Sequence, residues 1–285
     1  MNMDKSLNKL FTIKSLNNLI YERNVDNYKK IVNKLNGKPN EMLNLQNLKL
    51  IYKYMSVHHR NEYFYKNTLL NKILLGRHSI NTSTAIRELP IDGNILDFLI
   101  VNGTGSVYEI KTELDNLQRL KKQLDAYYRA FSFCNVVTDE THLKEIKRDI
   151  NIPELGILVL TKRNTLHEEK KAKEKTNHLN HKTMFRILRK YEFENILMNE
   201  FGYLPDINSL RYYDECFKMF RHINIFHAQK LMLAQLKRRC NINSNNLGSF
   251  NNVPKEIKFI IYFSNYKKND FNKLNSFLYK KTKEM

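Results

Sequence analysis

The chain has 285 residues, of which 42% are hydrophobic, enough to build a real core in one large domain or two small ones. Runs of about 18 apolar residues do not occur, so we expect no transmembrane helix. The polar start, MNMDKSLNKLF, likewise predicts no secretion signal. Three scattered cysteines without CxxC spacing indicate a reducing, cytoplasmic location and argue against a zinc ribbon: Cys134, Cys216 and Cys240.

The net charge is +19, from 48 lysines and arginines against 29 aspartates and glutamates. This excess predicts a polyanionic partner, most simply nucleic acid. No membrane partner is expected, because the chain has no long apolar run. The abundance of Lys, Asn and Ile, with no Trp, is also what an AT-rich genome produces by codon bias. The charge therefore permits nucleic-acid binding without proving it. The oligomeric state stays open, with a homodimer among the options.

The N-terminal part is expected to be helical. Apolar residues recur at helical spacing over residues 4–55, and the Gly-Pro pair within 36–40 marks a break. Residues 61–75 predict one more helix, which ends before Gly76.

Strands begin near Thr82. The segments 82–91 and 94–101 flank Asp92-Gly93, a dipeptide typical of a two-residue hairpin turn, and 106–112 follows as a third strand.

Beyond the third strand we expect alternating elements: a helix at 115–131, a strand at 133–138, a short helix at 141–148 and a strand at 154–161. Strand–helix–strand succession implies parallel pairing. The expected fold is therefore α/β, with a mixed sheet of about five strands flanked by helices.

Residues 164–182 are almost wholly polar and predict an exposed linker or flexible arm. Helical patterns resume after it, the first of them capped by Gly202. The expected division has four parts: a helical segment at 1–60, a core at 61–163, a charged linker at 164–182 and a mainly helical domain at 183–285.

Hairpin geometry brings charged residues together. If Asp92 and Gly93 are the two loop residues, Glu88 lies opposite Asp97. A three- or five-residue loop at 102–105 then places Asp97 opposite Glu109, whereas a four-residue loop sends Glu109 to the other face. Lys111 shares a face with Glu109 in either register, because strand side chains alternate.

Three crowded carboxylates repel one another, and a divalent cation removes that penalty. Oxygen ligands favour Mg²⁺ or Mn²⁺ over zinc, and a lysine beside such a metal can orient a water and stabilise charge on a phosphorane. This is the chemistry of phosphodiester hydrolysis. The competing interpretation is a solvated edge strand whose Glu-x-Lys pair is worth less than about 1 kcal/mol.

The next helix adds a supporting layer. Asp115 and Gln118 fit a capping box, which predicts that the helix starts at Asp115. Gln123 and Tyr127, four residues apart, lie beside its apolar stripe and are expected to face the end of the third strand. An ordinary helix-edge amide and a half-buried tyrosine are the alternative. Three cations nearby would give a positive rim for phosphates: Arg119, Lys121 and Lys122.

Asp97, then Glu109-Ile110-Lys111 on the next strand, then Gln123-x-x-x-Tyr127 on the helix, resembles the pattern of the PD-(D/E)xK nuclease superfamily. The Q-x-x-x-Y element is similar to that of its RecB-like branch. The wider run from Arg87 to Phe131 resembles a family of predicted bacterial nucleases with a sce-numbered name. The resemblance spans roughly residues 61–165.

The resemblance implies a restriction-endonuclease-like core and a metal-dependent nuclease. Glu88, Asp97 and Glu109 would hold Mg²⁺ or Mn²⁺, Lys111 would be the catalytic lysine, and Gln123 and Tyr127 would support the site. Two features depart from the pattern. Leu96, not proline, precedes Asp97, and in many members the first carboxylate lies on the preceding helix, which makes Glu62 a rival of Glu88.

We expect DNA rather than RNA as the substrate. Mobile-element defence or attack on a host would suit such a nuclease. Two alternatives remain: a non-cleaving nucleic-acid-binding or complex-forming module, and an RNA-cutting toxin. The sequence does not separate exonuclease from endonuclease action. It contains no P-loop or GxGxxG motif, so we expect no nucleotide-driven motor.

Overall fold

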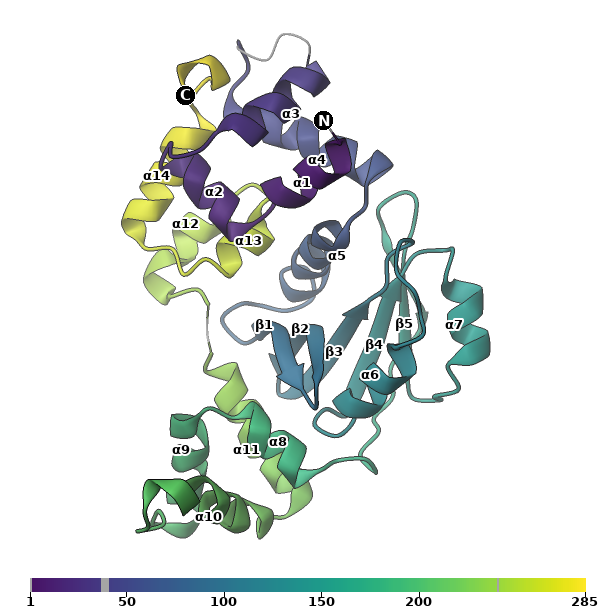
Figure 1. The fold of residues 1–285 in the computed structure, drawn as a ribbon, viewed down its shortest axis with the longest axis vertical. Coiled ribbons are helices and arrows are strands. Elements are labelled where there is room, and N and C mark those ends of the chain that lie inside the picture. Colours follow the sequence, from purple (N-terminus) through teal and green to yellow (C-terminus); the bar gives the residue numbers. More distant parts are fainter. Residues whose placement is uncertain (1, 37–40, 240) are drawn as a thin grey trace. The chain divides into compact units, whose positions relative to one another are not determined.

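The computed structural model describes residues 2–36, 41–239 and 241–285, which form two compact units (Figure 1). One unit joins Met1–His78 to Asn241–Met285, and the other is the continuous segment Ser79–Cys240. The predicted boundaries at residues 60, 163 and 182 do not coincide with this division, because the C-terminal tail packs with the N-terminal helices.

The first unit is helical. Its N-terminal elements are α1 (Met3–Leu10), α2 (Ile13–Ile20), α3 (Asp26–Asn36), α4 (Asn44–His58), α5 (Glu62–Leu69) and the π-helical turn η2 (Leu70–Leu74). Its C-terminal elements are η3 (Ser244–Asn246), α12 (Leu247–Asn251), α13 (Lys258–Tyr262), α14 (Lys268–Leu278) and η4 (Thr282–Glu284). The C-terminal tail from Val253 on, whose sequence pattern fits a helix as well as a strand, is therefore helical. The predicted break at 36–40 lies outside the described residues, except for Asn36 at the end of α3.

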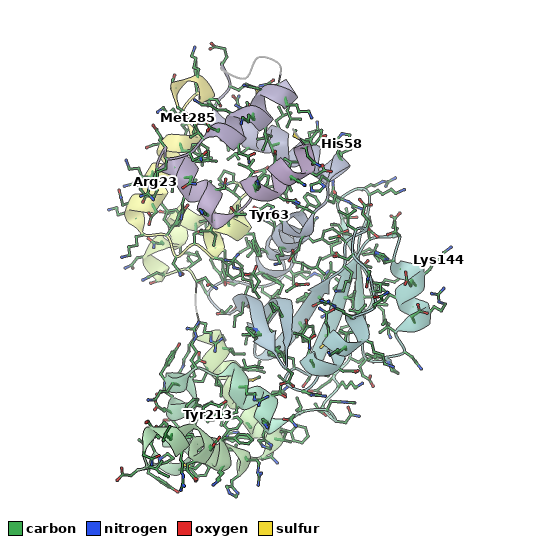
Figure 2. The ribbon with its side chains drawn as sticks, in the orientation of Figure 1. Arg23, His58, Tyr63, Lys144, Tyr213 and Met285 are labelled. Atoms are coloured by element: carbon green, nitrogen blue, oxygen red, sulfur yellow. The ribbon has the colours of Figure 1, made fainter. Side chains whose placement is uncertain are left out.

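Buried polar contacts tie the two ends of the chain together in this unit. The amide of Asn47 donates to the Thr282 hydroxyl at 2.8 Å, and that hydroxyl lies 2.7 Å from Asn44 Oδ1. The hydroxyl of Tyr63 donates to the backbone oxygen of Glu256 at 2.7 Å (Figure 2). Satisfied buried polar groups of this kind fix one arrangement of the tail on the N-terminal helices.

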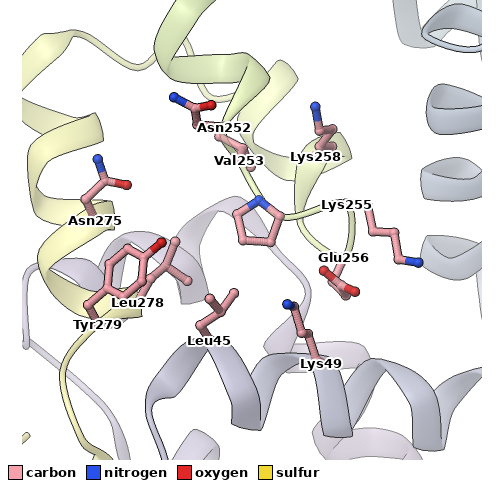
Figure 3. Close-up of a pocket in the computed structure, with 11 residues that line it drawn as sticks. Leu45, Lys49, Asn252, Val253, Lys255, Glu256, Lys258, Asn275, Leu278 and Tyr279 are labelled. Carbon is pink, nitrogen blue, oxygen red and sulfur yellow. The ribbon is translucent and has the colours of Figure 1, made fainter.

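A pocket of about 710 Å³ opens in this unit between α4, residues 252–258 and the end of α14 (Figure 3). Lys49, Lys255 and Lys258 line it together with Glu256. All of its lining residues belong to the helical unit, so the pocket is a feature separate from the sheet described next.

The second unit holds a six-stranded sheet in the order β1-β2-β3-β4-β5-β6. Its strands are β1 (Thr84–Ile91), β2 (Asn94–Asn102), β3 (Thr104–Ile110), β4 (Phe133–Thr138), β5 (Gly156–Leu160) and β6 (Leu166–Lys170). The pairs β3–β4 and β4–β5 are parallel and the other three pairs are antiparallel. This confirms the predicted α/β fold with a mixed sheet and flanking helices.

The sixth strand corrects the interpretation of 164–182 as a linker. Residues 166–170 pair with β5 and close one edge of the sheet. An edge strand exposed to solvent can carry the sequence LHEEK, with charges that discourage further pairing. Its polarity therefore reflects its position at the edge rather than a lack of structure.

The first hairpin has the predicted register. Ile91 pairs with Asn94 and Leu89 with Leu96, and the turn residues Asp92 and Gly93 have φ of 45° and 77°, as a type I′ turn requires. In the second hairpin Phe98 pairs with Tyr108, which is the register that places Glu109 on the face of Asp97.

The regular pairing is interrupted at Glu88 and Asp97. These two residues are missing from an otherwise continuous ladder, and Glu88 has a φ of 52°, which is uncommon for a residue with a side chain. Leu96 and Leu99, three positions apart, nevertheless contact the same hydrophobic core. Strict alternation would put them on opposite faces, so the alternation breaks at this point.

Helices complete this unit, some of them packed on the sheet and others packed on those helices. They are α6 (Leu120–Tyr127), α7 (Leu143–Asp149), α8 (His181–Ile187), α9 (Lys190–Phe201), α10 (Ser209–Arg221) and α11 (Ile225–Lys237). The apolar side chains of α6, α8 and α11 join those of β1–β3 in one cluster. The region 183–202, expected as one helix, is two helices that meet near Leu188, and Gly202 caps the second with a φ of 79° as predicted.

The predicted helix start at Asp115 is wrong. The helix α6 begins at Leu120, and the Asp115 carboxylate accepts hydrogen bonds from the backbone N and hydroxyl of Thr112, both at 2.8 Å. Aspartate side chains compete in this way with helix formation, because they bond nearby backbone groups in turns. The buried stripe of Leu120, Leu124 and Tyr128 lies as expected.

A buried ion pair fastens α11 to α9. The carboxylate of Glu192, 1% exposed, accepts from Arg239 Nε at 2.6 Å and Nη2 at 2.5 Å, and from the backbone N of Arg189 at 2.7 Å. Burial alone would raise the pKa of Glu192, but these donors bring it below its ordinary value.

We predict that Gly105→Ala destabilises the sheet unit by about 1–3 kcal/mol. A Cβ on Gly105 would lie 2.7 Å from Leu233 Cδ2 of α11 and 2.8 Å from Phe131 Cδ1. Urea unfolding measures the loss. The control is Gly248→Ala in α12, where a Cβ meets nothing within 4 Å and alanine favours the helix. If Gly105→Ala and the wild type unfolded at the same urea concentration, α11 would not pack on β3 as described.

We also predict that Glu192→Gln lowers the free energy of unfolding by about 3–5 kcal/mol at pH 7, because Arg239 is left without its partner. Since the folded pKa of Glu192 is depressed, its stabilisation is complete above the ordinary pKa of 4.5 and is lost as the pH falls through the folded value. The difference in the free energy of unfolding between the wild type and Glu192→Gln should therefore become smaller between pH 5 and pH 3. The control is Glu174→Gln, which changes an exposed glutamate. A difference in the free energy of unfolding that does not depend on pH would contradict the ion pair of Glu192 with Arg239.

Candidate active site

Charged side chains gather where β3 ends. Glu109 is 1% exposed and Lys111 is 8% exposed, and Lys111 Nζ donates to Glu109 Oε1 at 2.9 Å. The backbone N of Lys111 bonds Val137 O at 2.9 Å, which holds the end of β3 against β4. Burying two charges costs free energy that their attraction does not always repay, so further partners are expected around them.

The helix α6 supplies those partners. Gln123 Oε1 accepts from Lys111 Nζ at 2.9 Å, so the ammonium lies between a carboxylate and an amide. The Tyr127 hydroxyl lies 2.9 Å from Glu109 Oε2, to which it donates, and 3.0 Å from the backbone oxygen of Ile95 on β2. One helix thereby fixes both members of the buried pair.

Asp97 joins the cluster from β2. Its Oδ2 accepts from the backbone N of Ile110, the residue between Glu109 and Lys111, at 2.8 Å. The negative charge of Asp97 also acts on Tyr127. Asp97 therefore holds the backbone between Glu109 and Lys111, so that β2 and β3 each bring one carboxylate to the end of β3.

The electrostatics follow from this burial. Burial raises the pKa of Glu109, and Lys111, Tyr127 and Gln123 offset part of that rise by charge and hydrogen bonding. Burial raises the pKa of the Tyr127 phenol as well, and the charges of Glu109 and Asp97 add to the effect. Tyr127 is therefore a hydrogen-bond donor here and not a base.

The predicted first carboxylate does not join the group. Glu88 is exposed and lies at the break in the ladder. Within residues 2–36, 41–239 and 241–285, no three His, Cys, Asp or Glu side chains are grouped to hold a metal ion, so the trio of Glu88, Asp97 and Glu109 is not assembled. Its rival Glu62 lies in the helical unit, where it pairs with Lys66 at 2.6 Å.

The sequence reasoning missed Thr138, the last residue of β4, and Asp139, which follows it. Ile110 pairs with Val137, so Lys111 and Thr138 come next along the two neighbouring strands, and Thr138 still pairs with Val159 of β5. The Thr138 hydroxyl and Asp139 Oδ2 are buried and make no hydrogen bond among the described residues. The signal was available, because parallel strands bring their carboxyl ends to the same edge of a sheet.

Tyr127→Phe should destabilise the protein by about 1–3 kcal/mol, because it leaves the buried Glu109 carboxylate short of a donor. Its neighbour provides the matched control. Among the described residues, the buried Tyr128 hydroxyl has only the Cys134 thiol, a weak hydrogen-bonding group, as a side-chain hydrogen-bonding neighbour, so Tyr128→Phe should cost less than Tyr127→Phe. Urea unfolding of both variants measures the difference, and equal losses would contradict the assigned hydrogen bond.

Comparison with known proteins assigns the chain to a family. Residues 55–259, more than half of the chain, match the family described as Bacteriophage P4 protein cII. The match includes the whole sheet unit and every residue of the cluster. No curated protein and no solved structure matches the chain. None of the helices within the described ranges combines the length and apolar character that crossing a membrane requires.

This match corrects the resemblance drawn from the sequence pattern. The assignment to the PD-(D/E)xK nuclease superfamily, its RecB-like branch and the related family of predicted bacterial nucleases is wrong, because the family found over these same residues is a different one. The chain belongs to the bacteriophage P4 protein cII family.

Proposed function

We propose that this protein is a metal-dependent nuclease that hydrolyses phosphodiester bonds, with DNA favoured as the substrate. One observation carries the proposal: Lys111 Nζ is held 2.9 Å from both Glu109 Oε1 and Gln123 Oε1, with Asp97 bonded to the intervening backbone. A lysine and two carboxylates at one strand end are the groups that this reaction needs.

The two carboxylates fit Mg²⁺ or Mn²⁺. Mg²⁺ is commonly bound by one or two carboxylates together with substrate phosphate and water, so Asp97 and Glu109 are sufficient without a third acidic residue. Lys111 donates to one oxygen of Glu109 and Tyr127 donates to the other, and a carboxylate oxygen can accept two hydrogen bonds. When bound, the ion would supply charge neutralisation at the scissile phosphate.

The chain's own residues have distinct tasks in this proposal. Lys111 would orient the attacking water and stabilise the negative charge that develops on the phosphate. Gln123 would hold the Lys111 ammonium in place, and Tyr127 would fix the Glu109 carboxylate. Fixed orientation matters because misplacement of a catalytic group by about 1 Å can cost 100-fold in rate.

A second function is favoured by a specific feature of the same cluster. The Glu109 carboxylate accepts hydrogen bonds from both Lys111 and Tyr127 within the chain. A network with a purely structural role would have the same hydrogen bonds. The protein would then be a non-cleaving nucleic-acid-binding module, and its net charge of +19 would serve binding alone.

Cleavage of supercoiled plasmid separates the two functions. We expect nicking in Mg²⁺ or Mn²⁺, none in EDTA, and a loss of about 100-fold or more for Lys111→Ala, because it removes the positioned charge. Glu109→Gln should lose a similar factor. The matched control is Lys144→Ala, which removes an exposed lysine from α7 (Figure 2) and should leave the rate unchanged.

DNA binding without metal-dependent nicking in the wild type would refute the nuclease and support the binding module. Cleavage that survives in Lys111→Ala would refute the assigned site. A parallel assay with structured RNA tests whether RNA is the substrate instead.

A further inference from the structure

Asp92, at the tip of the first hairpin, connects three elements. Its Oδ2 accepts from the Thr183 hydroxyl of α8 at 2.7 Å and from Arg129 Nη1, just after α6, at 3.2 Å. Its other oxygen lies 4.0 Å from Arg186 Nη1 of α8. The positive φ of Asp92 and Gly93 makes the turn that presents this carboxylate, so the turn, α6 and α8 meet around a single acidic residue.

Two hollows flank Asp92 and share both Asp92 and Arg129 in their linings. One, of about 430 Å³, is lined by Lys121 and Lys122 of α6, and the other, of about 380 Å³, by Lys182 and Arg186. The two hollows adjoin on either side of the Asp92–Arg129 pair, and together we call them the Asp92 groove. Its cations are exposed and outnumber its carboxylates by five to two, Asp92 and Asp125.

The groove shares two elements with the candidate active site. Asn94 lines its first half and precedes Ile95, whose backbone oxygen lies 3.0 Å from the Tyr127 hydroxyl. Lys122 precedes Gln123, whose side chain accepts from Lys111. The groove and the buried cluster therefore use the same turn and the same helix.

We propose that the Asp92 groove binds the sugar–phosphate backbone of the nucleic acid and leads the strand to Lys111. This inference rests on the proposed function and specifies how the substrate is held. Charge complementarity selects the occupant, since lysines, arginines and amide side chains are the usual partners of backbone phosphates. Asp92 acts as a positioning residue: it orders Arg129 and Arg186 before binding, which reduces the entropy lost when they contact phosphate.

Salt dependence of binding tests the groove without cleavage. The probe is a fluorescein-labelled 20-base-pair DNA duplex, with the single strand as a second arm, measured by anisotropy in EDTA from 50 to 300 mM NaCl. Each lost phosphate contact should lower the slope of log K against log salt by about 0.9 for duplex and 0.7 for single strand. For Lys121→Ala/Lys122→Ala/Lys182→Ala/Arg186→Ala we expect the duplex slope to fall by 2 or more and affinity to fall at least tenfold.

The control is Lys144→Ala/Lys162→Ala, which removes exposed lysines from α7 and the β5–β6 turn, outside the groove. It should lower the slope by less than half a unit, and melting curves verify that all variants fold. Equal salt slopes for the groove variant and the wild type would overturn the inference. It would also be overturned if the control variant lowered the slope as much as the groove variant does.

The two proposals fail in distinguishable ways. If the salt slope falls in the groove variant but the wild type does not nick plasmid, DNA binding by the groove is supported and only the nuclease is refuted. Normal nicking together with an unchanged slope in the groove variant refutes only the groove.

Discussion

The arrangement of the candidate site follows from one costly interaction, the buried pair of Glu109 and Lys111 at the end of β3. Removing two charges from water is unfavourable, and the structure compensates with hydrogen bonds from three directions. The backbone of β4 fixes Lys111, Gln123 of α6 accepts from its ammonium, and Tyr127 donates to Glu109. The position of α6 is thereby set by polar contacts as well as by its apolar stripe, and the groove on its outer side is set with it.

The sequence was sufficient for those parts of the site that local rules determine. An Asp-Gly turn sets the register of the first hairpin, and alternation alone puts Glu109 and Lys111 on one face. Helical spacing places Gln123 and Tyr127 on one flank of α6. These rules depend only on residues close in sequence, so tertiary packing does not change the placement that they predict. The residues so placed are the ones that the structure brings together, whereas their catalytic roles stay predictions.

The rest required information that the sequence pattern does not carry. The break in alternation at Glu88 depends on a positive φ, for which a glutamate gives no signal, and it moves that side chain out of the predicted carboxylate trio. Asp115 had two local uses, a helix cap or a turn around Thr112, and only packing decides between them. β6 lacks hydrophobic alternation because it is an exposed edge. The short pattern of Asp97, Glu109-Ile110-Lys111 and Gln123-x-x-x-Tyr127 also proved a poor guide to family, since residues 55–259 match a different family.

The central claim is that the chain keeps the Glu109–Lys111 pair for chemistry and not for stability. The free energy of unfolding of the double variant Glu109→Leu/Lys111→Met tests it most directly. Apolar replacement of a buried pair that is not needed for stability is neutral or stabilising, by up to about 4 kcal/mol, whereas removing one partner alone costs about 3–5 kcal/mol. The account predicts a double variant at least as stable as the wild type, with Lys111→Met alone strongly destabilised. A double variant that loses several kcal/mol would show that the pair is structural and would contradict the claim.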